Sequence, residues 1–293
     1  MNSIEKFVDR LIHASPQGKS PDADAPVART AAPLSTLTTS KSGAESEVAV
    51  VDMQRLATAG MITPTNTRSL IAEEYRAIKR PLLKNVTNAQ AAAYSHANLI
   101  MVTSALPGEG KSFTSINLAM SIAMEMDHTV LLVEADVPKP AIAGYLGLAK
   151  EEKGLVDYLA DERLGLEELL FRTNIPKLTL LRAGRQHPQA TELLASQNMR
   201  RLTQELAQRY PDRVVIFDAP PLLVSSEAVV LAGLVGQVVM VIESGKTPQR
   251  VVKDALALIG SDKFVGVVLN KSQGGSSQGY GYGHYGTYGY GRE

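Results

Sequence analysis

Six short runs of almost purely apolar residues alternate with helical stretches between residues 98 and 272, and this alternation restricts the folds available to the chain. Strands of a parallel sheet that is covered on both faces are apolar throughout, whereas half-exposed strands alternate apolar and polar residues. The pattern therefore predicts an α/β fold built on a doubly wound, mostly parallel sheet. The expected strands are Leu99–Thr103, Val130–Val133, Leu178–Leu181, Val214–Phe217, Val238–Ile242 and Val265–Leu269.

Helices are expected between these strands, at Lys111–Met126, Thr191–Tyr210, Ser226–Leu231 and Pro248–Ile259. A further helix is expected ahead of the sheet over Thr67–Arg80, closed by Pro81 and with its buried face formed in part by Leu70, Ile71 and Ile78. Ligands of doubly wound sheets bind beyond the carboxyl ends of the strands. The functional residues are therefore expected where the predicted strands end.

The two ends of the chain differ in composition from the folded domain, which is expected to cover residues 48–272. Residues 1–14 carry apolar side chains at helical spacing, which predicts an amphipathic helix that docks a partner protein or, alternatively, a frayed terminus. Residues 15–47 are rich in Ala, Pro, Ser and Thr and are expected to form a disordered linker. Residues 273–293 contain eight of the 23 glycines and five of the ten tyrosines, which predicts a flexible tail.

The charge balance and the lack of cysteine argue against several classes of function. Lysine plus arginine equals aspartate plus glutamate, at 30 each among 293 residues, so no basic field attracts nucleic acid and no nucleic-acid partner is expected. A chain without cysteine forms no disulfide, cysteine-ligated zinc site or iron–sulfur cluster. The most apolar stretch, residues 228–242, is interrupted by glycines and is shorter than the roughly 20 residues of a membrane span, so no transmembrane segment is expected.

A phosphate-binding loop follows the first expected strand, in the sequence SALPGEGKS at residues 104–112. It matches the Walker A pattern GxxxxGK[ST] except that Ala105 replaces the first glycine. The glycines let the backbone curl so that its N–H groups point at phosphate oxygens. Lys111 brings positive charge to the β- and γ-phosphates, and Ser112 offers a hydroxyl to Mg²⁺. The motif predicts that a nucleoside triphosphate is bound by Pro107, Gly108, Glu109, Gly110, Lys111 and Ser112.

Carboxylates at the ends of two further expected strands support this interpretation. Asp218 ends VVIFD, a Walker B pattern in which an apolar strand brings a carboxylate beside the phosphates to hold Mg²⁺. Glu134 and Asp136 end VLLVEAD, and side chains two apart on a strand project to the same face, so both are expected to reach a shared metal or an incoming hydroxyl. Either acid can serve as the proton acceptor. The predicted Mg²⁺ ligands are Ser112, Asp136 and Asp218, and the predicted catalytic residues are Lys111, Glu134 and Asp136.

Together these motifs resemble those of the bacterial tyrosine kinases, specifically the tyrosine autokinases of exopolysaccharide loci, over residues 48–293. The resemblance rests on the Walker A loop, on VLLVEADVPKP as the family's Walker A′ strand, on VVIFDAPP at residues 214–221 and on the tyrosine-rich tail. EEYRAIK resembles the family's oligomerisation motif ExxRxxR through Glu73, Arg76 and Lys79. VGVVLNKS resembles the strand before a nucleotide-base loop, with Asn270 as the candidate base contact.

The resemblance implies a protein-tyrosine kinase that depends on ATP and Mg²⁺ and has a MinD/ParA-like P-loop core. It also implies a homo-oligomeric ring, a membrane-embedded chain-length regulator as partner, and a role in polysaccharide synthesis or export at the cytoplasmic face of the plasma membrane. The implied acceptors are tail tyrosines of a neighbouring copy, namely Tyr280, Tyr282, Tyr285, Tyr288 and Tyr290.

The chain departs from the family pattern at three positions. Glu134 replaces the first Walker A′ aspartate, and Pro138 stands where an arginine is usual. Lys79 stands at the third charged position of the oligomerisation motif and lacks the planar fork of the usual arginine.

The sequence is also compatible with two other functions. A MinD- or ParA-like positioning ATPase has the same fold, but it usually needs a second lysine early in the Walker A loop, where this chain has Ser104, Ala105 and Leu106. A non-catalytic ATP-binding regulator of polysaccharide export is the second alternative. The tail, taken alone, also has the composition of a self-associating low-complexity segment.

Overall fold

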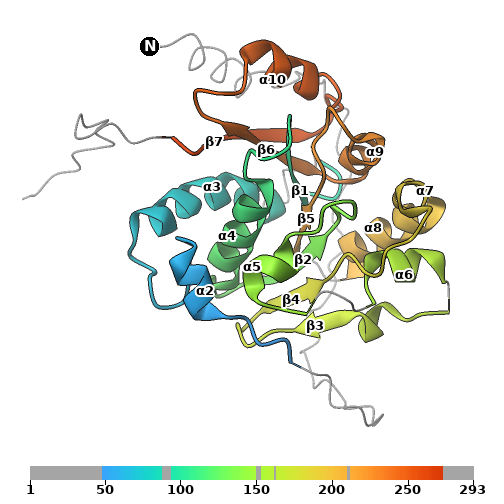
Figure 1. The fold of residues 1–293 in the computed structure, drawn as a ribbon, viewed down its shortest axis with the longest axis horizontal. Helices are drawn as coiled ribbons and strands as arrows, with labels where there is room; N and C mark the ends of the chain where they lie inside the picture. The colour runs from blue at the N-terminus through green and yellow to red at the C-terminus, as the bar shows by residue number, and fades with distance from the viewer. Residues whose placement is uncertain (1–47, 88–93, 150–152, 162, 210–211, 273–293) are drawn as a thin grey trace, which may run out of the picture.

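The computed structural model describes residues 48–87, 94–149, 153–161, 163–209 and 212–272. The expected docking helix at 1–14, the linker at 15–47 and the tail at 273–293 lie outside these ranges. The described part is one twisted sheet with helices packed on both of its faces (Figure 1). This arrangement confirms the predicted doubly wound α/β fold.

The sheet has seven strands within the described ranges, in the spatial order β3-β4-β2-β5-β1-β6-β7. Every neighbouring pair is parallel except β3 and β4, which are antiparallel at one edge. Six of the strands confirm the predicted ones; β3 escapes the sequence pattern because it has only three residues and none of them is buried. The strands are β1 (Leu99–Ser104), β2 (Thr129–Glu134), β3 (Leu170–Arg172), β4 (Leu178–Leu181), β5 (Arg213–Asp218), β6 (Gln237–Glu243) and β7 (Phe264–Asn270).

The helices cover the two faces of the sheet in two groups. One face carries α2 (Met53–Thr58), α3 (Leu70–Thr87), α4 (Lys111–Ala123) and α5 (Ile142–Leu146). The other face carries α6 (Leu155–Ala160), the 3₁₀ turn η1 (Leu166–Glu168), α7 (Ala190–Leu194), α8 (Gln197–Arg209), α9 (Ser226–Leu234) and α10 (Gln249–Leu256).

Side chains along the central strands alternate between two hydrophobic cores. On β1, Leu99 and Met101 pack into the core beneath α8 and α9, whereas Ile100 and Val102 pack into the core beneath α3 and α4. Because both faces are covered, apolar residues fill β1 until its carboxyl end. The carboxyl edge of the sheet is therefore the place where the central strands deliver polar side chains.

Helix α3 differs from its predicted bounds: it begins three residues later and continues through Pro81 to Thr87. Proline in a helix interior removes a backbone hydrogen bond and crowds the preceding turn, which is why the sequence predicts an end there. Tertiary contacts hold the last turns instead. Gln237, the first residue of β6, donates from Nε2 to Leu82 O at 3.2 Å and accepts from Asn85 Nδ2 at 2.8 Å.

The predicted burial of Leu70 is wrong, because this first residue of α3 is 78% exposed. Ile71 and Ile78 are half-buried and pack against the core, as expected. The single helix predicted over Thr191–Tyr210 is two helices, since the chain turns between α7 and α8. Ser196 Oγ accepts from Met199 N at 3.4 Å at that turn, which is the behaviour of a residue that begins a new helix.

Helix α4 ends at Ala123 instead of Met126. Lys177 Nζ donates to Glu125 O at 2.7 Å and to Met126 O at 2.6 Å, so a side chain from another segment binds the carbonyls that follow the helix. A basic group at this position also suits the negative end of the helix dipole.

Candidate active site

The Walker A loop joins β1 to α4 at the carboxyl edge of the sheet, where the sequence places it. Gly108 and Gly110 have φ angles of +86° and +99°, in the left-handed region that favours glycine. A Cβ at Gly110 would also collide with the side-chain amide of Asn270. Gly110 is the N-cap of α4, so the positive end of that helix dipole lies at the loop. The loop therefore has the backbone conformation that a phosphate-binding site requires.

Lys111, the first residue of α4, forms a buried ion pair with Asp136 from the segment after β2. Only 11% of the Lys111 side chain and 4% of the Asp136 side chain are exposed. Asp136 Oδ1 also accepts from Lys139 N at 3.2 Å. Because a buried charge is unfavourable unless it is paired, each partner fixes the other in place. The fold thus brings the predicted phosphate-binding lysine together with one Walker A′ acid.

Asp218 ends β5, which lies between β1 and β2, and it is fully buried. Its Oδ1 accepts from the Ser115 hydroxyl at 3.0 Å, while Oδ2 has no hydrogen-bond partner within the described ranges. Burial raises the pKa of Asp218 to about 6, although the Lys111 charge and the hydroxyls of Ser112 and Ser115 oppose the shift. A buried carboxylate oxygen without a partner is unusual and indicates a ligand position.

The predicted metal ligands Ser112, Asp136 and Asp218 offer the hard oxygen atoms that Mg²⁺ prefers. Nowhere in the described ranges do three or more acidic or histidine side chains gather into a cluster that could hold a metal ion. Mg²⁺ does not require such a cluster, because it is usually held by one or two carboxylates together with substrate phosphates and water. The residues therefore fit a magnesium ion that arrives with a nucleotide.

Glu134 is buried, and backbone donors occupy its carboxylate. Oε1 accepts from Ile142 N at 2.6 Å, and Oε2 accepts from Ala183 N at 3.4 Å. Strand β2 ends at Glu134, and the next two N–H groups both donate to Asp218 O, so the alternation of a strand does not extend to Asp136. The two acids therefore have different partners instead of a common one. Burial raises the pKa of Glu134, against the opposing effect of these N–H donors.

The Walker A loop is tied to the ends of β6 and β7 by side chains behind it. The buried Glu109 carboxylate accepts from Leu106 N at 2.6 Å and from the Thr247 hydroxyl. Asn270 Nδ2 donates to Glu109 O at 2.9 Å, and Lys271 Nζ donates to the preceding carbonyl of the loop at 2.7 Å. Glu109 and Asn270 thus shape the loop through contacts within the chain, and their contact with a nucleotide stays a prediction.

Three residues of this site are not singled out by any sequence motif: Ser115, Thr247 and Lys271. Ser115 lies one helical turn after Lys111, and this i+4 spacing is the signal that could have identified it. Thr247 and Lys271 reach the loop from the segments that follow β6 and β7, so no spacing within the Walker A motif points to them.

The three residues of the oligomerisation motif lie on α3 in two different environments. Glu73 and Arg76 form an ion pair on the exposed side. Lys79 is buried, donating from Nζ to Ser121 O at 2.6 Å and pairing with Glu125 at 2.6 Å. It therefore joins α3 to α4 within one chain, and the role of all three in oligomerisation stays a prediction.

The five predicted acceptor tyrosines lie outside the described residues. Within the described ranges, none of the helices combines the length and the apolar character that crossing a bilayer requires.

Similarity to known proteins bears directly on this site. No protein-family model matches the chain. The tyrosine-protein kinase YwqD of Bacillus subtilis (strain 168) is 35% identical over 231 residues, which cover 78% of this chain and 91% of YwqD. This chain belongs to the bacterial tyrosine-protein kinase family.

Further matches include one longer protein and two solved structures. The succinoglycan biosynthesis transport protein ExoP of Rhizobium meliloti (strain 1021) is 35% identical over 210 residues, which cover 70% of this chain and 25% of ExoP. The crystal structure of the VpsO kinase domain has 29% identity and a TM-score of 0.56, covering 69% of this chain and 98% of that one. The septum site-determining protein MinD of Pyrococcus horikoshii, complexed with Mg-ADP, has 20% identity and a TM-score of 0.51 over 61% of this chain and 72% of MinD, which shows the fold alone.

Proposed function

We propose that this chain is an ATP-dependent protein-tyrosine kinase that phosphorylates the tail tyrosines of a neighbouring copy. The observation that carries the proposal is the buried pair of Lys111 and Asp136 beside the unpartnered Oδ2 of Asp218, at the end of a preformed Walker A loop. Membership of the tyrosine-protein kinase family supports the reaction. The five tyrosines between residues 280 and 290 supply acceptors.

Phosphoryl transfer depends mainly on positioning and on electrostatic stabilisation of the transferred group. Lys111 and the N–H groups of the loop and of the α4 N-terminus supply positive charge at the phosphates. When bound, Mg²⁺ neutralises phosphate charge, and Ser112, Asp136 and Asp218 would hold it. Because the fold already buries these groups, little reorganisation is needed when ATP binds.

Glu134 and Asp136 are the two candidates to accept the phenolic proton. Both Glu134 oxygens accept backbone N–H groups, and the Asp136 oxygens bind Lys111 and one backbone N–H. In the proposed step the tyrosine oxygen bonds to the γ-phosphorus and the bond from that phosphorus to the β–γ bridging oxygen breaks. The phenolic proton passes to the carboxylate of Glu134 or Asp136, and ADP leaves.

Replacing Lys111 by methionine tests the proposal that the chain is a kinase. Incubation of purified wild-type chain with γ-labelled ATP and Mg²⁺ should label tyrosines in residues 273–293, and the Lys111→Met variant should lose at least 99% of this label. Lys84→Met is the matched control, because Lys84 is exposed on α3 and should leave labelling unchanged. Equal labelling of the Lys111 variant would end the proposal. Hydrolysis of ATP by the wild type without labelling would instead indicate a positioning ATPase.

We further propose that the kinase forms homo-oligomeric rings and works with a membrane-embedded chain-length regulator in polysaccharide synthesis or export. Its place is then the cytoplasmic face of the plasma membrane, and the helix expected at residues 1–14 is the proposed contact. The name of ExoP, a biosynthesis transport protein, supports this setting. This chain matches only a quarter of ExoP, so the functions of the rest of ExoP are not ascribed to it.

A further inference from the structure

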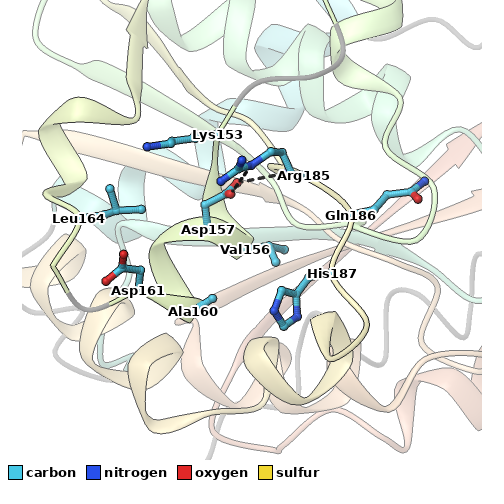
Figure 2. A pocket seen from close by; sticks show the side chains of 9 residues that line it. All are labelled: Lys153, Val156, Asp157, Ala160, Asp161, Leu164, Arg185, Gln186 and His187. Carbon is cyan, nitrogen blue, oxygen red and sulfur yellow. Dashed lines mark hydrogen bonds and ion pairs between the residues drawn. The ribbon is translucent and has the colours of Figure 1, made fainter.

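A cavity of about 360 Å³ opens at the carboxyl edge of the sheet, between α6 and the segment that follows β4 (Figure 2). Ala183, two residues before Arg185 in that segment, donates its N–H to Glu134 at the end of β2. The cavity therefore lies on the same edge of the sheet as the Walker A loop, toward the β4 side. None of its lining residues belongs to the Walker motifs.

The guanidinium of Arg185 lies at the rim with hydrogen-bonding capacity to spare. Its Nε donates to Asp157 Oδ1 at 2.8 Å, and its backbone N–H donates to Asp157 Oδ2 at 3.0 Å. Gly154 N also donates to Oδ2 at 3.0 Å, so the Asp157 carboxylate is satisfied within the chain. The Nη1 and Nη2 groups of Arg185 make no hydrogen bond within the described ranges. They form the fork that binds phosphate oxygens well.

Two further donors surround the same cavity. Lys153 lies beside Arg185 on one rim, and His187 faces them from the opposite side (Figure 2). His187 Nδ1 accepts from Gln189 N at 3.1 Å, which places the proton of a neutral ring on Nε2. The remaining acid of the lining, Asp161, is paired with Arg163. Among the described lining residues, the polar groups without a partner are thus mainly donors, as an anion requires.

The floor between these donors is apolar. Val156 is buried, and Ala160 and Leu164 continue the surface beside it. Such a floor suits a flat apolar group and not a free inorganic anion. An aromatic ring that carries an anionic group at its far end meets both features, with the ring over the apolar floor and the anion between Arg185 and His187.

We propose that this cavity binds phosphotyrosine of the chain's own tail. The inference rests on the proposed function, because phosphotyrosine is the product of that reaction. The tail is long enough: β7 and β4 are five strand spacings apart, about 24 Å, while the 18 residues from Ser272 to Tyr290 span up to roughly 60 Å when extended. A modified tail of the same copy or of a neighbour therefore reaches the cavity, and occupancy removes that tyrosine from the active site.

The binding test uses the full-length Lys111→Met chain, which keeps its own tail unphosphorylated under the proposed function. A fluorescent peptide of residues 278–293, phosphorylated at Tyr288 and Tyr290, is titrated with ADP and Mg²⁺ present at saturation. We expect it to bind at least tenfold more tightly than the unphosphorylated peptide and than a peptide with phosphoserine at both positions. Equal affinity for all three peptides overturns the proposal. A phosphoserine peptide that binds as tightly as phosphotyrosine overturns the role of the apolar floor.

Substitutions in the lining locate the binding site. Arg185→Gln should weaken binding of the phosphotyrosine peptide at least tenfold, and Arg55→Gln, which removes an exposed arginine from α2 on the other face of the sheet, should not change it. The double variant Lys153→Gln, His187→Gln alters only rim side chains and serves if Arg185→Gln misfolds; it should also weaken binding several-fold. Unchanged affinity in both variants would place the peptide elsewhere and refute the proposal. Because the peptide is synthetic, this result is independent of whether the wild-type chain labels itself.

Discussion

The most informative residue of the site is Asp218, because the structure buries its carboxylate and leaves one oxygen without a partner in the described ranges. Burial raises its pKa from 3.8 to about 6, so the folded chain binds that proton more tightly than the unfolded chain does. The stabilisation from the protonated form is complete below pH 3.8 and is lost as pH rises through about 6. At neutral pH, the charged Asp218 therefore lowers the free energy of unfolding of the ligand-free chain.

Asp218→Asn removes this charge, so we expect the variant to be more stable than the wild type at pH 7.5 without ligand, by at most about 3 kcal/mol. The difference should shrink toward pH 4, where the wild-type carboxyl is protonated. With ATP and Mg²⁺ the order should reverse, because the variant lacks a proposed metal ligand and gains less from binding. Urea unfolding across this pH range, with and without Mg-ATP, measures both effects. A variant stabilised by Mg-ATP as strongly as the wild type would remove Asp218 from the metal site.

Thr247 shows how a residue without any motif can act on the loop. Its hydroxyl donates to the buried Glu109 carboxylate, which also accepts Leu106 N of the loop. A hydrogen bond to a charged group contributes about 1.5–3 kcal/mol, so Thr247→Val should raise KM for ATP roughly tenfold. The turnover number should change less than twofold, because Thr247 does not reach the reacting groups.

Two variants control the Thr247 experiment. Thr247→Ser keeps the hydroxyl and should restore KM, and Thr58→Val removes a hydroxyl that donates to Gln54 O on distant α2. Steady-state kinetics over a range of ATP concentrations gives both parameters. If Thr247→Val keeps the wild-type KM for ATP, the hydrogen bond from Thr247 to Glu109 does not shape the loop.

At the scale of elements, the strands are predicted well because a doubly covered sheet requires apolar runs, and six such runs are visible in the sequence. The errors arise where tertiary contacts override local signals. Pro81 does not end α3, since Gln237 of β6 holds the turns beyond it. Likewise, the Walker residues were predictable from spacing, whereas the different partners of Glu134 and Asp136 depend on how the chain turns after β2.

Substitutions at Lys79 and Arg76 can distinguish a structural role of α3 from a role in assembly. Its Nζ binds Ser121 O and Glu125 on α4, so Lys79→Met should lower the free energy of unfolding by about 1–2 kcal/mol. Arg76→Met removes an ion pair with Glu73 and a hydrogen bond to Thr67 O, so it should lower it by about 0.5–1 kcal/mol but should reduce the mass of the assembly. Urea unfolding and light scattering of both variants test this division. An assembly lost in Lys79→Met at unchanged stability would contradict it.

At the scale of the whole molecule, phosphorylation changes the charge of a chain whose formal net charge is zero. Each phosphotyrosine adds about −1.5 to −2 charges, so five would add roughly −7.5 to −10. This charge is concentrated in the tail, and tails gathered in one ring would repel each other. The proposed cavity opposes that repulsion, because it pairs a phosphate with Arg185. Repulsion and capture therefore act on the same tails in opposite directions.

The proposed transfer between copies can be separated from transfer within one copy by mixing two variants. A chain that ends at Ser272 keeps every described strand and helix, so it should fold and bind ATP but lack acceptors. The full-length Lys111→Met chain has the proposed acceptors but lacks the predicted phosphate-binding lysine. Neither should be labelled alone by γ-labelled ATP, whereas the mixture should label the full-length chain, with a rate that rises with the concentration of the truncated one. An unlabelled mixture, alongside a wild type that labels itself at a rate independent of concentration, would show that each copy phosphorylates its own tail.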